Sequence, residues 1–264
     1  MTFPIKVIGS ILLLSISLST YSQDMKVKAK FISFKNARLS IGVGIDGSLS
    51  SFIINTSKPG DLKVLFKDPR KTDDKDYPFL AGGLALDLYS DNSVFGLLFG
   101  ANIVFLKQGF KKGDSAVDYF DMTRLEFPIS LKLRPGEFNA AQHFWLLIGG
   151  IYSMPLDCKR EHFRTAYAYP GYSDYIDNNK EQLSSCFLVS TSLGFEGYLS
   201  AKTRFAFFGT ASYPLIGNAI NSQYSDFKSG GKSVFSSSDN AVIKDLRLSF
   251  GLKILFGFWK TKGE

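Results

Sequence analysis

Residues 245–259 read Asp-Leu-Arg-Leu-Ser-Phe-Gly-Leu-Lys-Ile-Leu-Phe-Gly-Phe-Trp. Every even position from Leu246 to Phe258 is large and apolar, and the odd positions up to 257 are charged, Ser or Gly, except Leu255. A strand places successive side chains on opposite faces, so this period of two predicts a β-strand, and one longer than most strands of globular proteins. One face of this strand should meet an apolar environment and the other a polar one.

The same alternation recurs in earlier segments, most clearly at residues 39–46 and 124–134. With weaker segments in which both faces carry apolar residues, it predicts eight strands. They cover about residues 38–54, 79–90, 93–109, 118–134, 142–156, 186–200, 203–216 and 242–259. An even number of antiparallel strands is what a single-chain outer-membrane barrel requires.

The predicted connections alternate in length. Short turns fall near residues 90–93, 134–136 and 200–203, and longer polar segments near 55–78, 110–117, 157–185 and 217–241. Outer-membrane barrels show this asymmetry, with short periplasmic turns and long extracellular loops. The predicted fold is therefore all-β: an eight-stranded antiparallel transmembrane β-barrel with both termini at the short-turn rim.

The first residues resemble an export signal. Lys6 precedes an apolar stretch from Val7 to Leu18, and small residues near Ser22 offer a cleavage site. The stretch is short for a membrane-spanning helix, and no later apolar run is long enough to be one. We therefore expect a signal peptide at 1–22, a periplasmic segment at 23–37 and an outer-membrane barrel domain at 38–264.

Composition agrees with this assignment. The chain has 25 Phe, 12 Tyr and 24 Gly, residues suited to strands, membrane interfaces and close strand approach. Its 31 Lys and Arg are scattered among 24 Asp and Glu. A nucleic-acid-binding protein would concentrate its basic residues in a stripe, so no nucleic-acid partner is expected.

Three segments resemble a known family: residues 79–83 (FLAGG), 100–109 (GANIVFLKQG) and 124–133 (RLEFPISLKL). They are similar to the PorT-like outer-membrane β-barrel proteins of the Bacteroidetes type, which are built like the small OmpA and OmpX barrels. The resemblance implies outer-membrane lipid and the barrel-assembly machinery as partners, with Trp259 as the terminal aromatic that this machinery reads. The chain departs from that pattern by continuing to Glu264. The family also includes secretion-associated members.

Ten charged residues lie on the polar faces of the predicted strands, which point into the lumen. An eight-stranded barrel is only wide enough for side chains to fill, so buried charges there must pair. We predict an ion-paired plug that fixes strand register, with a conducting or proton-relay path as the alternative. The ten are Arg38, Asp46, Asp87, Arg124, Glu126, Lys132, Glu196, Asp245, Arg247 and Lys253.

Catalysis finds little support in the sequence. Only two His occur, and the topology puts His143 and His162 at opposite ends of the barrel. A Ser-His-acid hydrolase would need a His beside a Ser and a carboxylate, and no nucleophile motif marks such a place. Ligands for a metal are scarce as well. We expect neither an enzyme nor a metal or cofactor site.

The third long loop is flanked by Cys158 and Cys186, at the ends of two neighbouring predicted strands. In an oxidising compartment this position predicts a disulfide, and two unpaired thiols are the alternative. The loop between them is rich in aromatic and charged residues, which suits contact with a partner or merely covering the barrel mouth. The candidate contact residues are Phe163, Tyr167, Tyr169, Tyr172 and Tyr175.

Three functions remain open from the sequence. The first is a non-enzymatic outer-membrane barrel that presents surface loops to a protein partner or serves a secretion or envelope assembly. The second is a narrow, porin-like channel for small solutes. The third is a soluble, lipocalin-like binding barrel, since reversing the two faces gives the same alternation. Strand length, aromatic richness and loop asymmetry favour the membrane barrel.

Overall fold

The computed structural model describes residues 37–55, 62–65, 70, 79–90, 95–112, 116–134, 137–139, 142–164, 166, 173–178, 180, 183–217 and 242–258. The predicted signal peptide, the predicted N-terminal segment up to residue 36 and Trp259 lie outside these residues. Among the described residues, no helix has the length and apolar character needed to cross a membrane.

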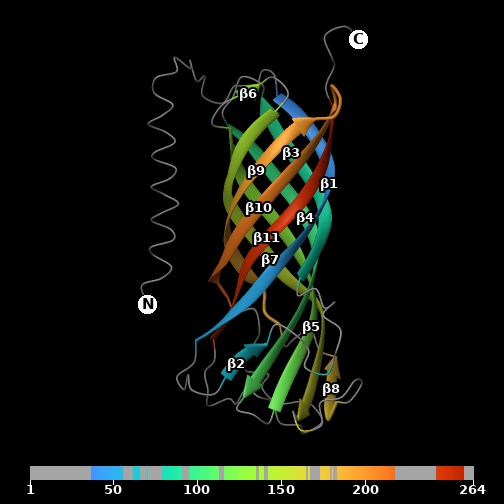
Figure 1. The fold of residues 1–264 in the computed structure, drawn as a ribbon, viewed down its shortest axis with the longest axis vertical. Helices are drawn as coiled ribbons and strands as arrows, with labels where there is room; N and C mark the ends of the chain where they lie inside the picture. Colours follow the sequence, from blue (N-terminus) through green and yellow to red (C-terminus); the bar gives the residue numbers. More distant parts are fainter. Residues whose placement is uncertain are drawn as a thin grey trace.

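Eight long strands close into one antiparallel ring, in the order β1-β3-β4-β5-β7-β9-β10-β11 and back to β1 (Figure 1). The predicted eight-stranded antiparallel barrel is thereby confirmed. The strands are β1 Ala37–Asn55, β3 Phe79–Ser90, β4 Phe95–Lys112, β5 Ala116–Leu133, β7 Gln142–Arg164, β9 Cys186–Tyr198, β10 Thr203–Ile216 and β11 Val242–Gly257. A short strand, β6 (Glu137–Asn139), pairs with β7 at the short-turn rim.

The alternation in the sequence becomes an outside and an inside. On β11, Phe250 is 73 % and Leu252 is 44 % exposed on the outer surface, whereas Arg247 and Ser249 are buried inside. Leu255, the exception in the sequence pattern, is buried inside as well. The barrel is therefore apolar on its outer surface and largely polar within.

The barrel continues at one end into a sheet that we call the extension (Figure 1). Strands β4, β5 and β7 run on beyond the ring, and β2 (Leu62–Leu65) and β8 (Tyr175–Asn178) pair with its two edges. The extension thus has the strand order β2-β4-β5-β7-β8.

The extension corrects three of the predicted loops, since β2 lies within 55–78 and β8 within 157–185. The sequence predicts loop at residues 110–117 and 157–164, but most of these residues belong to strands. The β4–β5 and β5–β7 ladders extend to Lys112↔Ala116 and Ala116↔Arg164. The charged residues in these segments resemble a loop in sequence. They lie on strands because neighbouring backbones satisfy their hydrogen bonds outside the ring as well.

A bulge in β7 sets which residues face inward in the extension. Arg124 on β5 pairs with Pro155 and Thr123 with Asp157, so Leu156 is an extra residue. An extra residue shifts the period of two by one position. Before the bulge the odd-numbered Ser153 is buried inside, and after it the even-numbered Cys158 is.

Apolar layers fill the space between the polar residues of the lumen. One layer consists of Leu98, Trp145, Leu147, Ala206 and Phe208. A larger one lies toward the extension and comprises Ala81, Val104, Leu106, Phe110, Phe120, Met122, Cys158, Leu183 and Ile243. The barrel interior is a packed core.

Candidate functional site: buried ion pairs and the extension

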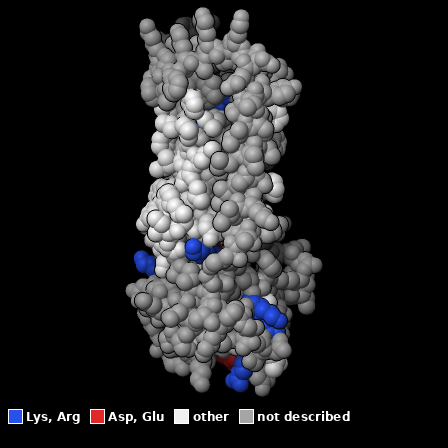
Figure 2. Space-filling view, turned by 90° about the vertical axis from the view of Figure 1, so that its left-hand side faces the viewer, with Lys and Arg blue, Asp and Glu red and all other residues white. Residues whose placement is uncertain are grey.

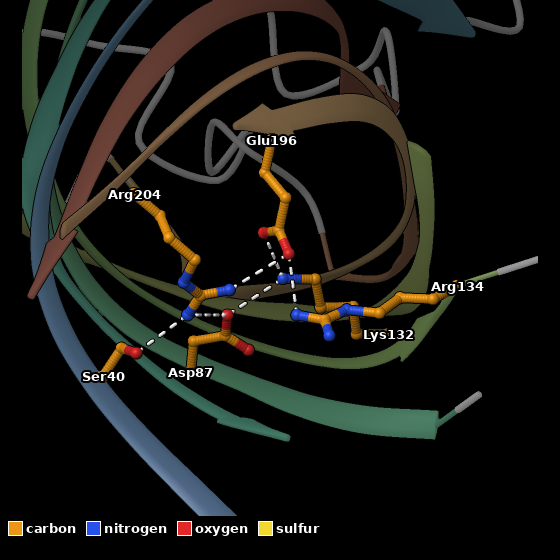
Figure 3. Close-up of polar contacts among 6 residues, drawn as sticks. All are labelled: Ser40, Asp87, Lys132, Arg134, Glu196 and Arg204. Carbon is orange, nitrogen blue, oxygen red and sulfur yellow. Dashed lines mark hydrogen bonds and ion pairs between the residues drawn. The ribbon is translucent and has the colours of Figure 1, made fainter. Parts of the chain in front are cut away.

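Near the short-turn rim, six inward-facing residues form the mouth cluster: Ser40, Asp87, Lys132, Arg134, Glu196 and Arg204 (Figure 3). They come from β1, β3, β9 and β10 and from the end of β5, so strands distant in sequence meet here. Lys132 Nζ lies 2.9 Å from Asp87 Oδ2 and 2.7 Å from Glu196 Oε2. One ammonium group therefore joins two buried carboxylates on opposite walls.

Arg204 contacts three other members of the mouth cluster. Its guanidinium donates to Asp87 at 3.0 Å, to Glu196 at 3.0 Å and to Ser40 Oγ at 2.8 Å. Arg134 adds a bond of 2.7 Å to Glu196. The guanidinium carbons of Arg134 and Arg204 lie 4.1 and 4.2 Å from the centre of the Tyr89 ring. Charge-assisted bonds of this kind are among the stronger ones, and here they are shielded from water.

A second group, the inner cluster, lies farther along the same strands. Glu126 Oε1 accepts hydrogen bonds of 2.7 Å from both Arg247 and Ser153, and Arg247 also pairs with Asp245. Arg124 donates to Ser153 Oγ at 2.8 Å and to the Ser184 carbonyl at 2.6 Å. The two cations here are matched by two carboxylates.

The remaining predicted lumen charges lie apart from these clusters. Lys253 Nζ is 4.3 Å from the centre of the Phe208 ring. Asp46 and Lys253 border a small cavity of about 20 Å³, together with Gly44 and Asn102. That volume suits a single water molecule. Arg38 lies at the rim of the barrel, where its register partner is Tyr89.

The extension holds its own buried charges. On the face continuous with the lumen, Asp118 accepts from Arg160 at 2.6 Å and lies 2.7 Å from His162 Nδ1. On the opposite face, Arg70 stacks 4.3 Å from the centre of the Phe163 ring and pairs with Glu161 at 2.5 Å. Arg70 belongs to the β1–β3 connection, so this contact fixes that connection on the extension.

Glu161 is held in its charged form. Burial alone would raise its pKa, but hydrogen bonds from Lys159, Arg70 and Ser173 and the charge of Arg70 outweigh burial and lower the pKa to about 2. Ser173 donates to Glu161 at 3.0 Å and accepts from Arg70 at 2.8 Å. The contacts of Glu161 thus connect β7 to two different connecting segments.

The structure does not contain the predicted disulfide. Cys158 and Cys186 are both free and buried. Cys186 pairs in register with Ser153, five residues along β7 from Cys158. Because Leu156 is unpaired, Ser153 and Cys158 are four ladder steps apart, opposite Glu126 and Met122 on β5. At about 3.3 Å per step the two cysteines are separated by roughly 13 Å along the sheet, beyond the reach of an S–S bond.

The predicted contact surface is only partly on the surface. Phe163 is fully buried beneath Arg70, because it faces the second apolar cluster of the extension with Val117 and Tyr119. Tyr175 on β8 is 40 % exposed, and its neighbour Ile176 is 54 % exposed. Tyr167, Tyr169 and Tyr172 lie outside the described residues.

Several site residues were not predicted. Arg204 could have been found from the alternation of β10, where Arg204, Ala206 and Ser212 all face inward, but Phe on both faces obscures that pattern. No sequence signal identifies Arg70. The inward turn of Arg160 and His162 depends on the bulge, which no residue pattern marks.

Among the described residues, no three His, Cys, Asp or Glu side chains gather as a metal site. No protein-family model and no curated protein matches the sequence. The similar solved structures include OprG of Pseudomonas aeruginosa, at 12 % identity over 85 % of this chain and 96 % of that one, with a TM-score of 0.44. Ail of Yersinia pestis is 11 % identical over 84 % of this chain and 97 % of that one, with a TM-score of 0.35. The NalP translocator domain of Neisseria meningitidis is 8 % identical over 97 % of this chain and 98 % of that one, with a TM-score of 0.30. At TM-scores this low, these likenesses establish neither a family nor a function.

Proposed function

We propose that this chain is a non-enzymatic, non-conducting barrel of the bacterial outer membrane that holds its extension at the cell surface as a contact site for another protein. The observation that carries the proposal is the reversed distribution of side chains. Arg124, Arg204 and Glu196 are buried inside the barrel, while outward Leu and Phe side chains are exposed. A barrel with an apolar outer surface and a charged interior is favoured when its outer surface is surrounded by lipid.

The same distribution argues against the soluble, lipocalin-like alternative. A lipocalin binds an apolar ligand inside its barrel and faces water outside. Here Leu193 and Phe250 are 62 and 73 % exposed on the outer wall, and an ion-paired cluster occupies the lumen.

The packing of the lumen argues against the channel. Charge pairs at the mouth cluster connect opposite walls, and side chains such as Trp145 and Phe208 pack between the mouth and the inner cluster. A conducting path needs a continuous wet passage. The packed barrel instead supports the extension, on which Tyr175 and Ile176 are exposed. The PorT-like resemblance makes a component of a secretion or envelope assembly the proposed partner.

The test combines location and conductance. The protein should fractionate with the outer membrane, migrate as a compact species on unboiled gels and give no discrete conductance steps in planar bilayers. Recovery from the soluble periplasm, or stepwise conductance, would contradict the proposal.

Orientation needs a separate measurement. A Cys placed at Ile176 should react with a membrane-impermeant maleimide on intact cells, whereas a Cys placed at Lys202, in the short β9–β10 turn, should react only after lysis. The native cysteines are buried and serve as the internal background. The reverse pattern would place the extension in the periplasm.

A further inference from the structure

The two rims of the apolar outer surface differ in charge. Among the described strand residues that face outward, charged side chains occur only toward the extension. Outward positions at the short-turn rim are instead apolar, as at Phe95, Leu133, Phe144, Phe205 and Phe256. The outward charges are Lys63, Lys107, Lys111, Asp121, Asp157, Lys159, Glu161 and Lys244.

Three of these residues form one row across neighbouring strands. Lys107 on β4 is the register partner of Asp121 on β5, which is in turn the partner of Lys159 on β7. The two lysines therefore flank Asp121 with their Cα atoms about 10 Å apart. Two residues along β4 toward the barrel, Phe105 is 48 % exposed on the apolar surface. Figure 2 shows Lys and Arg atoms where the pale barrel wall meets the extension.

The lysine side chains are accessible. Lys107 is 35 % and Lys159 is 48 % exposed, and each has one carboxylate partner, Asp121 at 3.5 Å and Glu161 at 2.5 Å. The Lys107–Asp121 pair is exposed on both sides and holds its partners weakly, whereas Glu161 is only 16 % exposed. An ammonium has three donors, so a lysine that pairs with one carboxylate keeps donors for a phosphate. Lys244 faces outward on β11, with its Nζ 5.5 Å from the centre of the Tyr213 ring.

We propose that this rim binds lipids with phosphorylated headgroups in the leaflet nearest the extension. The lysines reach the height of the phosphates while the acyl chains lie against Phe105 and its apolar neighbours, as long basic side chains do at membrane interfaces. The carboxylate of Asp121 lies within this row and weakens the binding. The inference rests on the proposed insertion into a membrane.

The experiment measures lipid selectivity in phosphatidylcholine vesicles that contain the inserted protein. Spin-labelled phosphatidic acid and spin-labelled phosphatidylcholine report by electron paramagnetic resonance which lipid the protein retains. We expect the wild type to prefer phosphatidic acid, and the preference to fall with added salt. Replacing the three rim lysines (K107Q/K159Q/K244Q) should lower the preference for phosphatidic acid by about fivefold or more. One lysine near an anionic surface usually contributes about that factor. Asp121→Asn should raise the preference.

The matched control is Lys63→Gln, which changes an exposed lysine on β2 of the extension and should leave the preference unchanged. Three results would overturn the inference. The wild type shows no preference for phosphatidic acid, the triple variant keeps the preference, or the control variant loses it to the same extent. Vesicle flotation and unboiled gel mobility are recorded on the same samples. Normal insertion without lipid preference removes only this inference, whereas failed insertion removes the proposed function as well.

Discussion

Single residues of the mouth cluster connect walls of the barrel that are far apart in sequence. Arg204 is fully buried, and it contacts Ser40, 164 positions away, and Asp87, 117 positions away. A buried charge that loses its partner is costly, whereas the exchange of a whole cluster for apolar residues need not be. Each member of the cluster is therefore sensitive to change on its own.

Arg204→Ala should lower the free energy of unfolding by about 3–5 kcal/mol, because Asp87 and Glu196 stay buried with fewer partners. The matched control is Arg164→Ala on the extension, where the side chain is 63 % exposed and its pair with Asp174 is 3.4 Å long. That change should cost under about 1 kcal/mol. Urea unfolding from vesicles measures both, and equal losses would show that the mouth cluster is not a stabilising network.

Acid should loosen the extension through Glu161. Its pKa is lowered to about 2 in the folded protein, below the ordinary value of 4.5, so its stabilising contribution is complete above pH 4.5 and is lost as the pH falls toward 2. Proteolysis of the extension by an acid-stable protease should therefore accelerate over this interval. In the Glu161→Gln variant, cleavage at pH 5 should be faster than in the wild type, and its rate should depend less on pH. A wild type with a flat profile between pH 5 and 2 would contradict the prediction.

At the scale of strands, the bulge at Leu156 lets β7 keep its partners on β5 despite one extra residue. Deletion of Leu156 should leave a regular ladder in which Asp157 still pairs with Thr123 and Cys158 with Met122, so that Cys158 keeps facing inward. The ring should still close, because the residues of β7 before the bulge keep their partners. Gel mobility and the protease resistance of the extension should therefore both be retained, and loss of either would show that the bulge itself is needed. Deletion of Leu146, within the ring, is the control, and it should abolish the compact species.

The two faces of β11 should differ in tolerance. Leu252→Arg places a charge on the apolar outer surface and should cost about 2–4 kcal/mol near the middle of the bilayer. Ser249→Ala on the inner face has no such cost and should change stability little. Urea unfolding from vesicles measures both substitutions. A more damaging Ser249 change would mean that the faces are reversed, in favour of a soluble barrel.

In the whole molecule, the ring and the extension are stabilised separately. The ring closes on itself through the β1–β11 ladder, and β2 and β8 pair only with strand segments that lie in the extension. A closed barrel leaves no unpaired strand edge, which makes it self-sufficient.

This separation predicts that the β4–β5 hairpin can be shortened. Lys107 and Asp121 are register partners, so residues 108–120 can be replaced by a two-residue Asn-Gly turn. The shortened protein should insert and keep its heat-modifiable gel mobility, and it should lose the protease resistance of the extension. A variant that no longer forms the compact species would show that the barrel depends on the extension.

The sequence by itself determined the barrel. Period-two alternation is a local property, so segments such as 245–259 predict strand, length and two faces without any partner, and eight such segments with alternating connections leave few other topologies. Leu255, the one apolar residue among the odd positions, faces the lumen as its position predicts and helps to fill it.

Only the tertiary structure decided what the residues far apart in the chain do. The partners of Arg204 lie on β1, β3 and β9, and register between distant strands is not written in any one of them. Because of the bulge at Leu156, the inward residues of β7 are odd-numbered before it and even-numbered after it. The register of β9 places Cys186 opposite Ser153 and out of reach of Cys158. Alternation fixes which face a side chain takes, but pairing between strands fixes its neighbours.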